Sequence, residues 1–241
     1  MSIAEKLVTI SDNMQNLFNA GKQAEYDTFW KVLQLHGNKN EYYFAFAGSS
    51  WNSWTLNPKY IIAPVDETVN SLSVQGLFYH CNRGNEATGL GKIDYRNIAH
   101  MFDFANIKNA QGMFANACMD YIVVDFSNVE AMQATFQDSN GYQTHITLTV
   151  SEKCTNFANA FYGASNLTDL IFTEGSVIAA NLDVKSCPLS KESITSIINA
   201  LSSSVTGKTL ALKKTAKEAA FTSAEWSALI ATKTNWTISL A

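Results

Sequence analysis

The side chains suited to metal binding or nucleophilic chemistry include four cysteines, Cys81, Cys118, Cys154 and Cys187. They lie 37, 36 and 33 residues apart, so they form no CxxC pair, and no histidine spacing completes a metal-ligand cluster around them. A free cysteine behaves as a small hydrophobic residue in a reducing compartment. The spacing therefore favours buried free thiols, and it predicts neither a metal centre nor a cofactor.

Other residue types used in catalysis also lack the required spacing. Gly89 and Gly91 precede Lys92, but the full GxxxxGK[ST] string of a phosphate loop is missing. The adjacent acids Asp66 and Glu67 could serve a glycosidase only if the fold brought another carboxylate within reach. The histidines are isolated, outside any HExxH or nucleophile motif, at His36, His80, His100 and His145. We therefore predict that the chain is not an enzyme.

Composition and charge narrow the class of protein further. Hydrophobic residues make up 46% of the 241 residues, enough for a substantial core, whereas charged residues make up only 16%. The net charge of −4, without a stretch rich in Lys and Arg, argues against a nucleic-acid partner. Glu5 and Lys6 interrupt what would be the apolar core of a signal peptide, and no run of about 18 apolar residues occurs. We expect a chain made in the cytoplasm, without a membrane span.

A phenylalanine recurs through the middle of the chain in a constant local setting. The repeated residues are Phe78, Phe102, Phe114, Phe136 and Phe161. The third residue after each of them is small, namely Cys81, Ala105, Ala117, Ser139 and Ala164. The intervals are 24, 12, 22 and 25 residues, and three of the four fit the roughly 20 to 29 residues of a leucine-rich repeat.

Each repeated unit predicts a short helix or turn, a tight corner and one strand. Apolar residues lie seven and four positions before most of the phenylalanines, as Val129 and Met132 do before Phe136, which predicts one face of a two-turn helix. Stretches rich in β-branched and aromatic residues follow at 121–124, 144–150 and 170–172. Stacked units could bury one phenylalanine per coil in an internal ladder. The predicted fold is an α/β repeat, a short leucine-rich-repeat-like solenoid, and the alternative is a generic α+β core.

These repeats resemble a known bacterial family. Residues 126–136, FSNVEAMQATF, are similar to the tSNVtnMssMF signature of BspA-like leucine-rich repeats, and residues 159–167, NAFYGASNL, are similar to its MFygCssL continuation. The resemblance covers residues 77–188 and implies a solenoid there. It implies little about the ligand, because solenoids present surfaces to many ligands.

The segments before the repeats predict N-terminal helices and a cap. From Ile3 to Ala24 apolar residues follow heptad spacing, compatible with a coiled coil and also with a helix docked on its own repeats. A second helix is predicted over 26–37, from a face formed by Tyr26, Phe29, Trp30 and Leu33. We assign residues 1–38 to this helical segment and residues 39–76 to a cap of the solenoid. Aromatic residues of the cap either close the end of the solenoid or stack on sugar rings; these are Tyr42, Trp51 and Trp54.

After Pro188 the repeat pattern stops, and residues 189–241 predict an α+β C-terminal cap. Ser190 can cap a helix whose apolar face is Ile194, Ile197, Ile198 and Leu201. Thr222 and Glu225 have the spacing of a capping box before another helix. Strands are predicted at 209–212 and 235–240.

Both ends of the chain carry a second resemblance. The segments GKQAEYDTFW (21–30) and EWSALIATKTNWTISLA (225–241), combined with BspA-like repeats, resemble proteins encoded by phages and prophages of gut Firmicutes. Such proteins are generally taken as virion or tail-associated components, so the resemblance implies a non-enzymatic module that binds a host-surface glycan or protein. A structural scaffold protein of a phage particle and a bacterial BspA-like surface adhesin are the alternatives.

The heptad segment predicts assembly. Ile at d with a mixture of Leu and Met at a does not specify a dimer, and the phage resemblance implies a trimer in which several weak ligand sites act together. Light scattering should report more than one chain per particle. Leu7→Asp combined with Leu17→Asp should give a monomer whose repeats stay folded. A wild-type chain that stays monomeric at high concentration would mean that the first helix packs on its own repeats.

Overall fold

The computed structural model describes residues 107–117, 119–139 and 145–241, together with five short strands nearer the N-terminus. These strands are β1 (Ala24–Asp27), β2 (Val32–Leu35), β3 (Tyr60–Ile62), β4 (Leu72–Ser73) and β5 (Ile93–Asp94). The first helix, the cap aromatics and two of the repeated phenylalanines lie outside the described residues; they are residues 3–23, Tyr42, Trp51, Trp54, Phe78 and Phe102.

The helix predicted over residues 26–37 is wrong where strands β1 and β2 lie. These two strands pair antiparallel, with Tyr26 opposite Leu33, and β3 pairs parallel to β2. Apolar residues three and four apart occur in short strands as well as in helices, and this segment is rich in aromatic residues that favour strands. The heptad register that reaches Ala24 also ends in β1.

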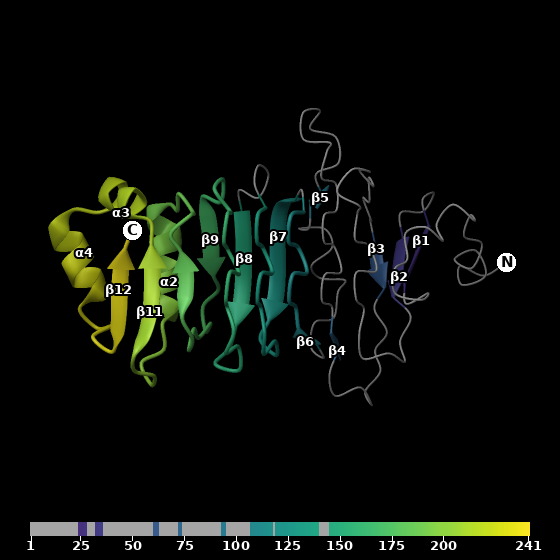
Figure 1. Ribbon diagram of the computed structural model, residues 1–241, viewed down its shortest axis with the longest axis horizontal. Helices are drawn as coiled ribbons and strands as arrows, with labels where there is room; N and C mark the ends of the chain where they lie inside the picture. Colours follow the sequence, from purple (N-terminus) through teal and green to yellow (C-terminus); the bar gives the residue numbers. More distant parts are fainter. Residues whose placement is uncertain are drawn as a thin grey trace.

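A parallel sheet forms one side of the repeat region. Its order is β5-β7-β8-β9, with β7 at Met119–Phe126, β8 at His145–Val150 and β9 at Asp169–Phe172. Buried and more exposed side chains alternate along β8 and β9, as expected for strands with one face on the core. The strands predicted at 121–124 and 170–172 are confirmed, as is the one at 144–150 over its described residues 145–150, and Figure 1 shows β7, β8 and β9 side by side. Strand β6 (Ile107–Asn109) pairs with β4 instead.

Three stacked turn segments, residues 110–117, 132–139 and 157–164, connect these strands on the other side of each coil. Every second backbone N–H donates to a carbonyl of the following segment. Phe114 N donates to Thr135 O at 2.9 Å, and Phe136 N donates to Ala160 O at 2.8 Å. Other N–H groups close turns within their own segment, as Met113 N does on Ala110 O at 3.1 Å. The stacked turn segments therefore satisfy much of one another's backbone.

The backbone of the turn segments corrects the prediction of a two-turn helix before each phenylalanine. The residues two before and two after each phenylalanine have a positive φ, between 50° and 72°. They are Gly112 and Asn116, Ala134 and Asp138, and Asn159 and Gly163. A right-handed helix requires negative φ throughout, and it sends each N–H to a carbonyl of its own helix. The 3–4 spacing of apolar residues here comes from successive tight turns.

The phenylalanines of the turn segments form a stacked column in the core. Phe114, Phe136 and Phe161 are fully buried. Ring centroids of Phe114 and Phe136 lie 5.5 Å apart, those of Phe136 and Phe161 lie 5.4 Å apart, and the rings are nearly parallel. The small third residue after each ring is also buried, and Ser139 Oγ donates to Phe136 O at 2.7 Å. A larger side chain at that position would meet the packed interior.

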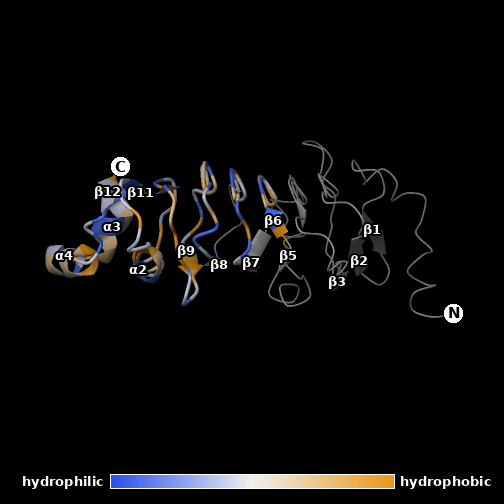
Figure 2. Ribbon diagram, turned by 90° about the horizontal axis from the view of Figure 1, so that it is seen from below, coloured by the Kyte–Doolittle hydropathy of each residue, from blue (hydrophilic) through white to orange (hydrophobic). Residues whose placement is uncertain are grey.

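The C-terminal region forms a second parallel sheet with helices. Figure 1 shows β11 and β12 running opposite to β7, β8 and β9, and Figure 2 shows them on the other side of the molecule. The sheet order is β10-β11-β12. The elements are β10 (Leu182–Val184), α2 (Lys191–Ala200), β11 (Lys208–Leu212), α3 (Lys214–Ala220), α4 (Ser223–Ile230) and β12 (Trp236–Leu240).

The local predictions for this region are confirmed. The Ser190 side chain accepts from Ser193 N at the start of α2, whose apolar residues are buried as predicted. Thr222 and Glu225 form the capping box of α4. Strands β11 and β12 match the segments expected at 209–212 and 235–240. Helix α3 was not among the expected elements.

Helix α2 covers the edge of the first sheet. It lies beside β9, on the side of the molecule that carries β7 and β8 (Figure 2). Ser193 Oγ accepts from Leu170 N at 2.9 Å, and Ser196 Oγ accepts from Phe172 N at 3.2 Å. Ser196 Oγ also donates to Leu170 O of β9, and Ser193 Oγ donates to Thr168 O just before the strand. The helix thus provides partners for edge groups that a further strand would otherwise bind.

The ring column makes the repeat region sensitive to truncation. Phe136→Ala should lower the free energy of unfolding by about 3–5 kcal/mol, because removing the middle ring leaves a cavity and deprives both neighbouring rings of a stacking partner. Chemical denaturation monitored by circular dichroism measures this loss. Tyr162→Ala, at an exposed neighbouring aromatic, is the control and should change it by less than about 1 kcal/mol. Similar losses in the two variants would contradict the ring column.

Two glycines of the turn segments separate backbone strain from close packing. At Gly163 (φ +72°) a Cβ would collide with Asp138 Oδ1, so the Asp138 side chain would have to shift, and it would lie 3.3 Å from Asp138 Cα. Gly112 (φ +61°) has nothing within 4 Å of that position. We expect Gly112→Ala to cost about 1 kcal/mol and Gly163→Ala at least about 2 kcal/mol, because only the second adds a clash to the positive φ. Equal losses in thermal unfolding would refute the close approach of Asp138.

Candidate functional site

The outer side of the first sheet presents a continuous surface, which we call the sheet face. Strand register places its residues in three rows across β7, β8 and β9. All nine side chains are half-buried or exposed. They are Tyr121, His145 and Asp169; Val123, Thr147 and Ile171; and Asp125, Thr149 and Thr173.

The first row brings together an aromatic ring, an imidazole and a carboxylate. The rings of Tyr121 and His145 stack with centroids 4.8 Å apart and an angle of 28°. His145 Nδ1 lies 2.6 Å from Asp169 Oδ2 on the next strand. His145 was predicted to be isolated, and the structure corrects this, because parallel pairing aligns residues that are distant in sequence. The constant step of 24 residues from Tyr121 to His145 to Asp169 is the signal that could have identified the row.

The other two rows are more apolar or bear hydroxyl groups. Thr149 Oγ1 and Thr173 Oγ1 are hydrogen-bonded at 2.9 Å, and Asp125 Oδ1 accepts from Ser127 N at 2.9 Å. The middle row combines two β-branched apolar side chains with a threonine. No Lys or Arg occurs among the nine residues, so the sheet face carries two carboxylates without a permanent cation.

The first row lacks the nucleophile that a hydrolytic triad would need. His145 is bound by Asp169, as a base in such a triad would be. However, in the described part of the chain no Ser, Thr or Cys is hydrogen-bonded to the imidazole. The arrangement can bind and orient a ligand, and within the described residues no Ser, Thr or Cys lies where a hydrolytic triad would place its nucleophile.

The described cysteines are buried and weakly acidic. Cys154 and Cys187 lie in the core as free thiols. Burial raises the pKa of each thiol to about 12. Because the thiolate is the nucleophile and the metal ligand, neither side chain suits catalysis or metal binding near neutral pH. Cys81 and Cys118 lie outside the described residues.

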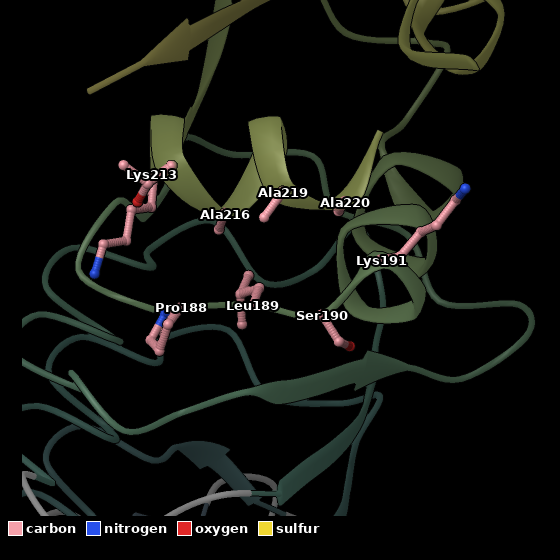
Figure 3. A pocket seen from close by; sticks show the side chains of 9 residues that line it. Pro188, Leu189, Ser190, Lys191, Lys213, Ala216, Ala219 and Ala220 are labelled. Carbon is pink, nitrogen blue, oxygen red and sulfur yellow. The ribbon is translucent and has the colours of Figure 1, made fainter. Parts of the chain in front are cut away.

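A hollow lies between α3 and the start of α2. This hollow has a volume of about 580 Å³, and Figure 3 shows Ala216 and Ala219 facing Leu189 across it. Lys191, at one end, is hydrogen-bonded to Glu225 at 2.7 Å and lies over the Phe221 ring. The Lys191 ammonium, with the Thr222 cap, lowers the pKa of the Glu225 carboxyl to about 2. The hollow therefore has a small-residue lining, and one of its two lysines is already paired.

Other functional features are limited within the described ranges. No group of three or more His, Cys, Asp or Glu side chains could hold a metal ion there. Within the same ranges, no helix is long and apolar enough to cross a membrane. Phe114, Phe136 and Phe161 are core residues, so they cannot contact a ligand directly. The exposed aromatic Tyr162 lies on the turn side, away from the sheet face.

Comparisons with known proteins assign no family to the chain. It matches no protein-family model, no curated protein and no solved structure. The function must therefore be inferred from the residues and their geometry.

Proposed function

We propose that this chain is a non-enzymatic binding module, built as a short leucine-rich-repeat-like solenoid, and that the sheet face is its ligand surface. The observation that carries the proposal is the first row, where Tyr121, His145 and Asp169 meet on three parallel strands. Solenoids commonly use the surfaces of stacked repeats for binding. A row of fixed polar and aromatic side chains is suited to recognition.

The stacking of the coils supports the solenoid part of the proposal. Consecutive rings of the core column are 22 and 25 residues apart, within the roughly 20 to 29 residues of leucine-rich repeats. Each turn segment is hydrogen-bonded to its sequence neighbour. Such nearest-neighbour contacts are typical of repeat proteins.

The non-enzymatic part of the proposal is supported by the chemistry of the described residues. The His145 imidazole is oriented but has no adjacent nucleophile, and the buried thiols stay protonated near neutral pH. A binding role needs neither group. The sheet face is therefore better suited to holding a ligand than to transforming one.

The biological setting is proposed from the phage resemblance. It points to a virion or tail-associated protein, trimeric by the same resemblance, that binds a host-surface glycan or protein. A nucleic-acid ligand is disfavoured by the net charge of −4 and by the two carboxylates of the sheet face.

A substitution in the centre of the sheet face tests the proposal. Thr147→Arg places a long charged side chain in the middle row and should weaken binding to glycans or proteins on a host-surface array by about tenfold or more. Thr237→Arg is the matched control, because Thr237 is exposed on β12 in the other sheet. It should leave binding unchanged, and both variants should keep the wild-type melting temperature. Equal binding by the two variants would place the ligand surface elsewhere.

A further inference from the structure

Strand β12 forms an edge of the second sheet, and alternate backbone groups along it point away from that sheet. Ala241 directly follows the strand, and its N–H donates to Leu212 O of β11 at 3.0 Å. Because backbone direction alternates along a strand, the N–H and C=O groups of Ile238 and Leu240 point the opposite way, outward from the sheet. Among the described residues neither of these N–H groups has an acceptor. The edge therefore offers donors and acceptors to another strand.

The fold covers the edge of the first sheet but leaves the edge of β12 open. At β9, Ser193 and Ser196 of α2 bind the edge backbone groups. No described element takes that place beside β12, since Figure 2 shows α4 on the side of the molecule that carries α2. Strand β12 also lacks the charged side chains and the proline by which edge strands commonly avoid pairing. Such an edge is a template for a strand from another molecule.

The surface around this edge carries little free charge. We call residues 222–241 the α4–β12 surface, and Figure 1 shows α4 and β12 together at one end of the molecule. Its charged side chains are Glu225 and Lys233. Glu225 is bound by Lys191 at 2.7 Å, and Lys233 Nζ donates to a backbone carbonyl at 2.6 Å. Leu240 is 38% exposed on the same surface. Depletion of charge around an apolar centre is typical of the core of a protein–protein interface.

A second copy of this chain matches the open edge. If β12 pairs antiparallel with β12 of a second copy about a two-fold axis at Ile238, each Ile238 N–H meets the Ile238 carbonyl of the other chain. Each Leu240 N–H then meets the Trp236 carbonyl of the other chain, which also points outward. Trp236 N–H is already used within its own chain, where it donates to Lys233 O at 3.0 Å. Every outward N–H therefore finds an acceptor.

The side chains of β12 agree with this pairing. Trp236, Ile238 and Leu240 share the core-facing side of the strand, where Trp236 is buried and Ile238 packs against the core. In the pair, Leu240 lies opposite Trp236 of the second copy, so the exposed leucine gains an apolar neighbour. Thr237 and Ser239, on the other side, remain exposed to solvent. No charged side chain on either strand opposes a like charge.

We propose that the α4–β12 surface is a two-fold interface between two copies of this chain, in which antiparallel pairing of β12 joins their second sheets into one. This interface goes beyond the proposed ligand surface and does not involve the heptad segment. Because the paired strands are short and bury a small area, the contact is weak and depends on concentration.

Sedimentation of the full-length chain at increasing concentration measures the association. The chain carries Leu7→Asp and Leu17→Asp, so that contacts between heptad segments do not contribute. It should be a monomer at low concentration and should become a dimer as the concentration rises. A chain that stays monomeric at the highest concentration would overturn the interface.

Amide hydrogen exchange in the same chain tests the pairing residue by residue. At low concentration the N–H groups of Thr237 and Ser239 should exchange slowly because they are directed to β11, whereas those of Ile238 and Leu240 should exchange fast. When dimers form, exchange at Ile238 and Leu240 should slow. Fast exchange that persists at both residues in the dimer would mean that the chains associate through another surface.

Substitutions of Leu240 test the edge in the same background. Leu240→Pro removes an N–H that is unbonded among the described residues, so the fold should be kept while the dimer loses one hydrogen bond from each chain. The dissociation constant should rise about tenfold or more. Leu240→Lys should weaken the dimer similarly, because a lysine on an edge strand opposes pairing. The matched control is Tyr162→Lys, at the other exposed large hydrophobic residue of the described part.

The control decides whether the effect belongs to the edge. Tyr162→Lys should leave the dissociation constant unchanged, and melting temperatures at low concentration should show that every variant is folded. Equal weakening by Tyr162→Lys and Leu240→Lys, or unchanged dimers in folded Leu240→Pro and Leu240→Lys, would refute the pairing of β12. Protection of the Ile238 and Leu240 amides only after another protein is added would assign the edge to a strand of that protein and would overturn the second copy as occupant.

Discussion

Successive coils of the repeat region must keep one common spacing on both of their sides. On the sheet side, parallel strands pair at about 4.8 Å. On the turn side, alternate N–H groups reach the next segment at 2.7–3.0 Å, as Asp138 N and Gly112 N do. The core rings then stack at 5.4–5.5 Å. Because backbone pairing on both sides and ring packing hold the same coils together, a shift in any one of them would disturb the other two.

That spacing explains the unusual backbone of the turn segments. A positive φ two residues on either side of each phenylalanine directs alternate N–H groups along the stack. Glycine, asparagine and aspartate tolerate this conformation, and they occupy five of the six positions. Ala134 is the exception, and its N–H still donates to Ala158 O at 2.9 Å. The hydrogen bonds between successive turn segments therefore stabilise a backbone conformation that alanine alone would disfavour.

Sequence patterns predicted the features that depend on short segments. The strands of the first sheet, the Ser190 cap and the Thr222–Glu225 capping box follow from a few adjacent residues, and each is confirmed. The prediction of helices before the phenylalanines was wrong, because tight turns and helices share the 3–4 spacing of apolar residues. The His145–Asp169 pair was missed because it depends on strand register, which a reading of local motifs does not provide.

Helix α2 limits the extent of the sheet face at one edge. Beyond β9, helix α2 takes the place of a further strand, and Ser193 and Ser196 bind the edge backbone groups. A ligand lying across the strands therefore meets the helix next to Asp169. In the other direction β7 pairs with β5, so the sheet continues on the Tyr121 side. An extended ligand that reaches the His145–Asp169 pair would consequently run from the pair towards β7 and β5, because the sheet ends at α2.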